Sequence, residues 1–146
     1  MTDLREIAAE ETHSLRHAIL RQNQPIAACA YPGDDDPHTA HFGAYMNGDL
    51  VGVASLYCED LPDTASGTAW RLRGMATVEA VRGQGHGRRL LRACIDRAAS
   101  ERGEVVWCNA RASACAFYAR EGFSVEGEEF ELPQIGPHFL MKKLLT

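Results

Sequence analysis

Apolar residues recur along the chain with two different periods, and the alternation between them predicts an alternation of strands and helices. The clearest strand signal is a hairpin, because Asn47-Gly48 supplies the positive φ of a type I′ turn between two apolar runs. From Leu90 to Ala98 the apolar residues recur at helical spacing instead, and Gly103 provides a stop. Strands are expected at 3–8, 41–46, 50–57, 70–78, 104–109, 123–131 and 138–145, with helices beginning at Thr12, Gln84 and Ser113.

This order, β-α-β-β-β-α-β-α-β-β, predicts an α/β (α+β) fold with a mixed central sheet of about seven strands and helices on both faces. In the first helix Leu15, Ala18 and Ile19 are expected to share a face. The 146 residues and the 45% hydrophobic fraction suit one packed core, so 1–146 is expected to be a single domain. The stretch 21–37 breaks the periodicity and predicts a functional loop or an irregular helix.

Composition narrows the classes of function. A net charge of −5 argues against a general nucleic-acid or anionic-membrane surface. No apolar run approaches the ~20 residues of a membrane span. Five cysteines without a CxxC pair, and without a signal peptide before them, favour a reducing, cytoplasmic compartment. Cys94 and Cys108 are expected in the core, and the sequence leaves open whether the protein is a monomer or a homodimer.

A glycine-rich turn between a strand and a helix is the first candidate for chemistry. In Arg82-Gly83-Gln84-Gly85-His86-Gly87 the glycines leave backbone N–H groups uncovered at a helix N-terminus, which predicts a phosphate or pyrophosphate site. A P-loop is excluded because no Lys-Ser or Lys-Thr pair follows, and Gly-x-Gly-x-Gly does not fit a Rossmann fingerprint. The alternative interpretation is that this glycine-rich turn connects the strand to the helix and binds no ligand. The side chain of His86 is expected to point outward.

This turn, the order of elements and the run Phe117 to Phe123 (Phe-Tyr-x-x-x-Gly-Phe) resemble the GNAT superfamily of N-acetyltransferases over nearly the whole chain. Within that superfamily the chain is similar to bacterial glyphosate N-acetyltransferases. The matching stretches are 15–17, 19–21, 23–26, 72–77, 107–111 and 136–138. The match departs at 32–39 and 62–68.

The resemblance implies an acetyl-CoA-dependent N-acetyltransferase acting on the amine of a small anionic amino acid or a phosphonate analogue such as glyphosate. By likeness, Arg21, Arg73 and Arg111 bind the anionic acceptor. His138 then contacts the acceptor as the catalytic base, and Tyr118 lies near the coenzyme sulfur. The residues expected to hold the coenzyme are Met75, Ala76, Thr77, Arg82, Gly83, Gln84, Gly85, His86, Gly87 and Arg88.

The side-chain types suit these roles. An ammonium group must lose a proton before it attacks, and histidine is the side chain that titrates near neutral pH. A guanidinium fork binds a carboxylate or phosphonate bidentately, and a phenol can return a proton to a departing thiolate. The backbone of 75–78 would pair with the pantetheine arm, and an N–H near Met75 would stabilise the oxyanion. His13 and His17 are more typical of a surface pair than of a metal site, so no metal is expected.

Several alternatives stay open. A GNAT enzyme could instead acetylate a peptide N-terminus, a polyamine or an aminoglycoside, and Asp34-Asp35-Asp36 would suit a polycation. A non-catalytic acyl-CoA-binding domain would keep the glycine turn but would not need His138 or Tyr118, and a dinucleotide-binding module is the last option. Direct attack without an acetyl-enzyme is expected, because nothing in the sequence around Cys108 and Cys115 indicates a depressed thiol pKa.

Overall fold

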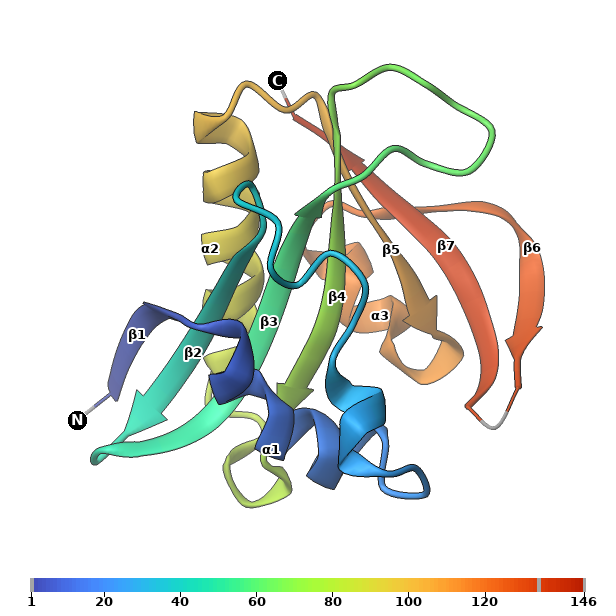
Figure 1. The fold of residues 1–146 in the computed structure, drawn as a ribbon. Coiled ribbons are helices and arrows are strands. Elements are labelled where there is room, and N and C mark those ends of the chain that lie inside the picture. The colour runs from blue at the N-terminus through green and yellow to red at the C-terminus, as the bar shows by residue number, and fades with distance from the viewer. Residues whose placement is uncertain (1, 134, 146) are drawn as a thin grey trace. The chain divides into compact units, whose positions relative to one another are not determined.

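Seven strands form one sheet in the order β1-β2-β3-β4-β5-β7-β6 in the computed structural model, which describes residues 2–133 and 135–145 (Figure 1). The sheet is mixed, because β4 and β5 pair in parallel whereas β1–β2, β2–β3, β5–β7 and β6–β7 pair antiparallel. The strands are β1 (Thr2–Ile7), β2 (Ala40–Met46), β3 (Asp49–Cys58), β4 (Ala69–Thr77), β5 (Val105–Arg111), β6 (Ser124–Leu132) and β7 (Gly136–Leu144). The α-helices of this described part are α1 (His13–Leu15), α2 (His86–Ser100) and α3 (Cys115–Arg120). The predicted mixed sheet of seven strands is confirmed.

The chain forms two compact units, and β4 contributes to both. The first unit contains the residues up to 57 together with 72–97, and the second contains 58–71 and the residues from 98 onward. The single domain expected from the chain length stays a prediction. Within the described residues, no helix is long and apolar enough to cross a bilayer.

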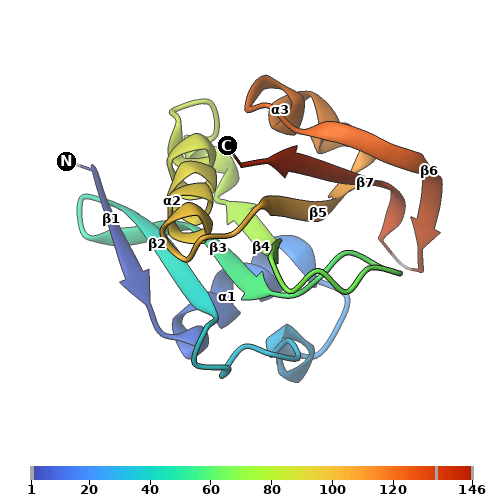
Figure 2. The same ribbon diagram turned by 90° about the horizontal axis from the view of Figure 1, so that it is seen from above.

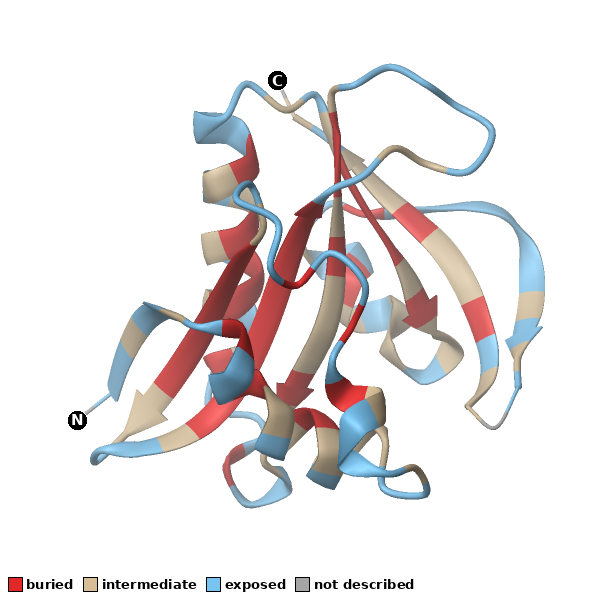
Figure 3. Ribbon diagram, in the orientation of Figure 1, coloured by how far each residue is buried: buried red, intermediate tan, exposed pale blue. Residues whose placement is uncertain are grey.

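In the first unit, the predicted hairpin and the long amphipathic helix pack together. β2 and β3 are joined by Asn47 (φ 53°) and Gly48 (φ 88°), as the type I′ turn requires. Helix α2 covers one face of these strands, and the segment containing α1 lies on the other face (Figures 1 and 2). At Gly52 an added Cβ would lie 2.9 Å from Leu90 Cδ1, so a glycine in β3 lets α2 approach closely. Burial is concentrated in β2, β3 and the inner side of α2 (Figure 3).

The segment 9–20 is not the regular helix that the sequence predicts. It consists of a 3₁₀ turn η1 (Ala9–Thr12), the short α1 and a π-helical turn η2 (Arg16–Leu20) closed by a 2.9 Å bond from Arg21 N–H to the Arg16 carbonyl. The expected shared face of Leu15, Ala18 and Ile19 is only half buried or exposed. The segment instead buries Ala9, Thr12 and Arg16, and the Arg16 guanidinium bonds to partners elsewhere in the unit.

In the second unit, β7 lies between β5 and β6, and α3 packs against β7 (Figure 2). The register of β5 with β7 runs from Val105↔Leu144 to Arg111↔His138. The predicted boundaries agree with these elements to within a few residues. Helix α3 is shorter than predicted because 112–114 form a 3₁₀ turn, and β7 begins at Gly136 instead of His138.

Candidate active site

The glycine turn lies between β4 and α2 in the first unit. Gly83 (φ 85°) and Gly85 (φ 87°) adopt the left-handed conformation, and a Cβ added to either would meet no atom within 4 Å. The first bond of α2 runs from Arg89 N–H to the Gly85 carbonyl (3.1 Å), so the amides of residues 86–88 precede the helical ladder. The turn therefore has an open side and amides available for an anion.

The side chains of the turn divide into exposed and buried groups. Arg82, Gln84 and Arg88 are exposed, and Arg82 Nε donates to the Thr77 carbonyl (3.1 Å). His86 was expected to point outward, and this expectation is wrong: the residue is 1% exposed. Because α2 begins at His86, this residue lies four positions before Leu90 on the buried face of the helix.

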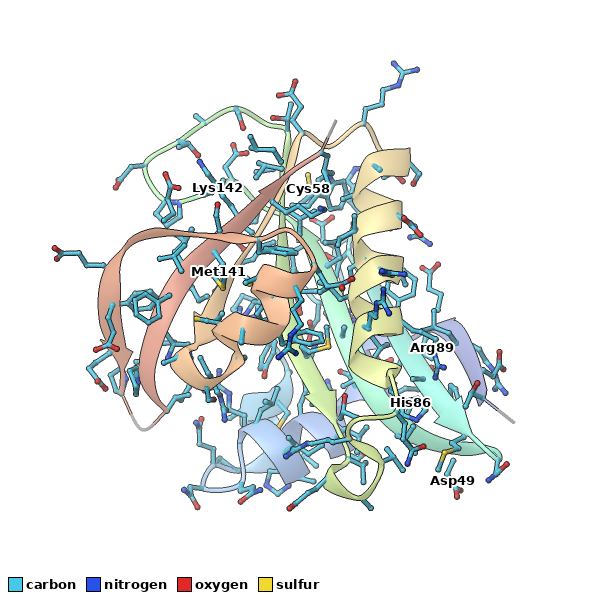
Figure 4. All side chains as sticks on the ribbon, turned by 180° about the vertical axis from the view of Figure 1, so that it is seen from behind. Asp49, Cys58, His86, Arg89, Met141 and Lys142 are labelled. Atoms are coloured by element: carbon cyan, nitrogen blue, oxygen red, sulfur yellow. The ribbon has the colours of Figure 1, made fainter. Side chains whose placement is uncertain are left out.

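The buried imidazole of His86 packs beside Arg89, one turn further along α2 (Figure 4). Arg89 Nη2 donates to His86 Nδ1 at 2.6 Å, and His86 Nε2 is buried with no hydrogen-bond partner among the described residues. Burial lowers the pKa of His86, and the charge of Arg89 lowers it further. His86 is thus a neutral acceptor for Arg89, and only its backbone amide lies at the open side of the turn.

Two of the three expected acceptor-binding arginines lie on one aromatic ring. In the first unit the guanidinium carbon of Arg73 lies 4.4 Å from the centroid of the Tyr31 ring, and that of Arg21 lies 5.5 Å from it. A third guanidinium, that of Arg16, lies 4.0 Å from the same centroid. Tyr31 is buried, whereas Arg21 and Arg73 are half buried. The ring attracts the cations through its quadrupole and gathers them in one place.

A fully buried ion pair lies beside this ring. Arg16 donates through Nη1 to Asp34 Oδ2 (2.8 Å) and through Nη2 to Asp34 Oδ1 (3.1 Å). Burial alone would raise the pKa of Asp34, but hydrogen bonds from Arg16, Tyr57 and the Tyr31 amide outweigh it and hold the pKa below its ordinary value. The carboxylate suggested above as a partner for a polycation is therefore already neutralised inside the unit, and only Asp35 and Asp36 are exposed.

The ion pair is surrounded by further polar groups. Tyr57 donates to Asp34 Oδ1 (2.5 Å), and burial followed by this bond raises the pKa of the phenol. His41 is buried with Nδ1 2.6 Å from Ser55 Oγ and Nε2 3.0 Å from the Asp34 carbonyl. Arg16 also donates to the Cys29 carbonyl (2.7 Å) and to Ser55 Oγ (2.9 Å). These bonds fix the members of the network through the two Nη atoms of Arg16, whereas Arg16 Nε is buried with no hydrogen-bond partner among the described residues.

The second unit holds the expected base and the third arginine. His138 on β7 is the register partner of Arg111 on β5, so the two side chains leave the same face of the strand pair. His138 is 3% exposed, and its Nδ1 lies 2.8 Å from the Gly136 carbonyl. A carbonyl only accepts, so Nδ1 carries the hydrogen and Nε2 keeps the lone pair. The Phe130 ring lies 6.0 Å away at 33° to the imidazole.

Tyr118, the other proposed catalytic residue of the second unit, is held by aromatic contacts. The Tyr118 ring contacts Phe117 and Phe123 edge to face, with centroids 5.1 and 5.5 Å apart. Arg71, two positions before Arg73 in β4, pairs with Glu59 (3.0 Å) and lies over the Trp107 ring.

The thiols of Cys108 and Cys115, in the second unit, are not activated. Burial raises the pKa of Cys108 to about 12, and it also raises the pKa of Cys115. Neither environment favours a thiolate nucleophile.

The Acetyltransferase (GNAT) family is matched over residues 1–123. The chain belongs to this family. It is 37% identical over 145 residues to the uncharacterized N-acetyltransferase YitI of Bacillus subtilis (strain 168), covering 99% of this chain and 97% of that protein.

Solved structures share the fold. A putative N-acetyltransferase from Lactobacillus plantarum superposes with a TM-score of 0.78 at 22% identity over 99% of both chains. An aminoglycoside 6′-N-acetyltransferase complexed with coenzyme A gives 0.77 at 14% identity over 97% of this chain and 96% of that chain.

The GNAT enzyme described here is an N-acetyltransferase, and its acetyl donor is acetyl-CoA. The residues of the glycine turn fit this donor, because a diphosphate needs open backbone amides and nearby positive charge, and Arg82 and Arg88 supply the charge. Bound acetyl-CoA supplies the thioester carbonyl that an amine attacks.

Proposed function

We propose that this enzyme transfers acetyl to the amine of a small anionic amino acid or of a phosphonate analogue such as glyphosate. The observation that carries the proposal is the pair of half-buried guanidinium groups, Arg21 and Arg73, gathered on the Tyr31 ring. A planar fork of donors suits a carboxylate or a phosphonate, and a pair of cations suits an acceptor with more than one negative charge. Arg111, which we also propose to bind the acceptor, is the register partner of the proposed base, His138.

The proposed chemistry is direct attack. His138 Nε2 takes the proton from the acceptor ammonium, and the free amine forms a bond to the thioester carbonyl carbon. The backbone N–H near Met75 stabilises the oxyanion of the tetrahedral intermediate. When that intermediate collapses, the C–S bond breaks and Tyr118 gives its proton to the thiolate. The nitrogen, still cationic after the attack, loses its second proton, and this proton restores the phenol of Tyr118. The raised thiol pKa values of Cys108 and Cys115 support attack without an acetyl-enzyme.

The proposed coenzyme site combines the backbone of β4 with the glycine turn. Met75, Ala76 and Thr77 would pair with the pantetheine arm as an added strand does. The residues from Arg82 to Arg88 would bind the diphosphate through backbone amides and the two exposed arginines. His86 would contribute its amide, and its buried ring would orient Arg89. Five cysteines without a CxxC pair fit the cytoplasmic location that we also propose.

The test is a comparison of acceptors by coenzyme A release. Amino acids with two carboxylates, phosphonates including glyphosate, a polyamine and an aminoglycoside are offered at equal concentration. We expect turnover with an anionic acceptor, and we expect Arg73→Ala and Arg21→Ala each to raise its KM by roughly 10- to 100-fold, as loss of a charge-assisted hydrogen bond predicts. The KM for acetyl-CoA should not change.

The matched control is Arg120→Ala, which removes an exposed arginine from the end of α3. It should leave both KM values unchanged. Faster turnover of the polyamine than of every anionic acceptor would contradict the proposal.

A further inference from the structure

We propose that the buried Arg16–Asp34 ion pair positions the acceptor-binding arginines Arg21 and Arg73, and that it does so through Tyr31. This inference depends on the proposed function, since it assigns a positioning role behind the same anion site. Arg16 and Asp34 themselves touch no acceptor, because their side chains are 0% and 5% exposed.

The first link is from Asp34 to Tyr31. The Asp34 carboxylate accepts the Tyr31 N–H at 2.8 Å, and the Asp34 N–H donates to the Tyr31 carbonyl at 3.1 Å. The backbone of Tyr31 is therefore tied at both of its polar groups. Arg16 lies 4.0 Å from the centroid of the Tyr31 ring and fixes the side chain as well.

The second link is from Arg16 to Arg21 through the backbone. The Arg16 carbonyl accepts the Arg21 N–H at 2.9 Å and closes the π-helical turn that ends there. The π-helical turn therefore begins at Arg16, the residue whose side chain is buried. The bond that closes this turn fixes the backbone position from which the Arg21 side chain extends. Arg16 thus connects to Arg21 by its backbone and to Tyr31 by its side chain.

The third link is from Arg16 to the strand that carries Arg73. Gly74 in β4 has φ +65°, and an added Cβ would lie 3.3 Å from Arg16 Nε and 3.4 Å from Tyr31 Cε2. The backbone next to Arg73 therefore packs directly on the same two side chains. Together the three links connect Arg16, through its backbone carbonyl and its guanidinium, to Arg21, to Tyr31 and to the backbone next to Arg73.

Stability alone does not account for such a pair. A buried ion pair loses its hydration, and apolar residues of similar volume often serve stability as well or better. What the pair adds is geometry, since the Arg16 guanidinium donates to four residues: Cys29, Asp34, Ser55 and Tyr57. A misplacement of about 1 Å in a substrate-positioning group can cost ~100-fold in rate, so fixed geometry matters more here than added stability.

The experiment replaces the pair by apolar side chains in the full-length enzyme, as the double variant Arg16→Met/Asp34→Leu. Thermal unfolding establishes that the variant is folded. Steady-state kinetics then give KM and kcat for acetyl-CoA and for the anionic acceptor that is turned over fastest in the comparison of acceptors. We expect the acceptor KM to rise roughly 10- to 100-fold with the KM for acetyl-CoA unchanged. A folded double variant with an unchanged acceptor KM overturns the inference.

The single variant Asp34→Asn decides the matter even if the double variant does not fold. It removes a negative charge beside an anion site, so the electrostatic field alone predicts tighter binding and a lower acceptor KM. Positioning predicts the opposite sign, because an amide cannot accept both guanidinium bonds together with the Tyr57 and Tyr31 donors. A higher KM supports the inference, and a lower or unchanged KM overturns it.

Arg73→Ala is measured in parallel, so that the two proposals can fail separately. If Arg73→Ala raises the acceptor KM and the Arg16–Asp34 variants do not, the positioning role is wrong and the proposed function stands. If Arg73→Ala leaves the acceptor KM unchanged, the proposed function is wrong, and the inference falls with it.

Discussion

The hydrogen bond between His138 and the Gly136 carbonyl determines which nitrogen of the imidazole can act as a base. Gly136 has φ +111°, a conformation that favours glycine, and this turn presents its carbonyl to Nδ1 only two residues further on. With Nδ1 protonated, Nε2 is the nitrogen that can take a proton. Because the ring is 3% exposed and lies beside Phe130, little of it can be reached by water.

At the residue scale, replacing His138 by alanine should reduce kcat by roughly 100- to 10,000-fold, the usual contribution of a positioned general base. The binding of acetyl-CoA, measured by calorimetry, should be unchanged, because His138 is not among the residues proposed to hold the coenzyme. His13→Ala is the matched control, since it removes a half-buried histidine that has no proposed role. A His138→Ala enzyme that keeps most of its kcat would contradict the assignment of the base.

At the scale of elements, the glycine turn before α2 and the turn of the β2–β3 hairpin share one backbone requirement. Gly85 (φ 87°) and Gly48 (φ 88°) both adopt the left-handed conformation in open space. An L-residue at either position is strained by about 1–2 kcal/mol, although nothing nearby obstructs its side chain. The two turns differ in that only Gly85 lies where the diphosphate is proposed to bind.

Gly85→Ala and Gly48→Ala should therefore lower stability by similar amounts but differ in kinetics. We expect Gly85→Ala to raise the KM for acetyl-CoA roughly 10-fold or more, because a Cβ and a shifted backbone would obstruct an anion at the amides. Gly48→Ala should leave that KM unchanged. The two variants are compared by thermal unfolding and by initial rates at varied acetyl-CoA. Equal KM values in both would mean that the turn does not hold the coenzyme.

Much of the fold could be predicted from the sequence because its signals are local. Alternation of apolar residues and Asn47-Gly48 predicted the hairpin, and the helical spacing from Leu90 to Ala98 predicted α2. The glycine turn was also predicted, since alternate glycines at a strand–helix junction form a local signal. These elements depend on the period of the pattern and on turn chemistry, and neither requires knowledge of distant residues.

The parts that failed depend on distant contacts or on a spacing that was not carried far enough. His86 was assigned to the glycine turn and expected to point outward, although it lies four positions before Leu90 and therefore on the apolar face of α2. Arg16 resembles a surface residue in the sequence, because its partner Asp34 lies eighteen positions later, within the aperiodic stretch 21–37. Only the clustering of Asp34 and Tyr31 in that stretch could have indicated a buried polar site.

At the scale of the whole molecule, the buried polar network links stability to pH in two ranges. The pKa of Asp34 is lowered in the folded chain, so its contribution is present above the unfolded value near 4 and is lost as the pH falls through the folded pKa. The pKa of Tyr57 is raised in the folded chain. Its contribution is complete below the unfolded value near 10 and is lost as the pH rises through the folded pKa.

The alkaline range offers the cleaner measurement, because a single hydroxyl can be removed without changing the charge at neutral pH. Thermal unfolding of the natural enzyme should show a melting temperature that falls above about pH 10, where the unfolded chain ionises Tyr57 and the folded chain does not. In Tyr57→Phe the melting temperature should be lower at neutral pH, since the bonds to Asp34 and Arg16 are lost, but it should fall less steeply above that pH. Tyr45→Phe, which removes a half-buried phenol from β2, should keep the alkaline slope of the natural enzyme. The same slope in Tyr57→Phe as in the natural enzyme would show that this phenol does not couple folding to pH.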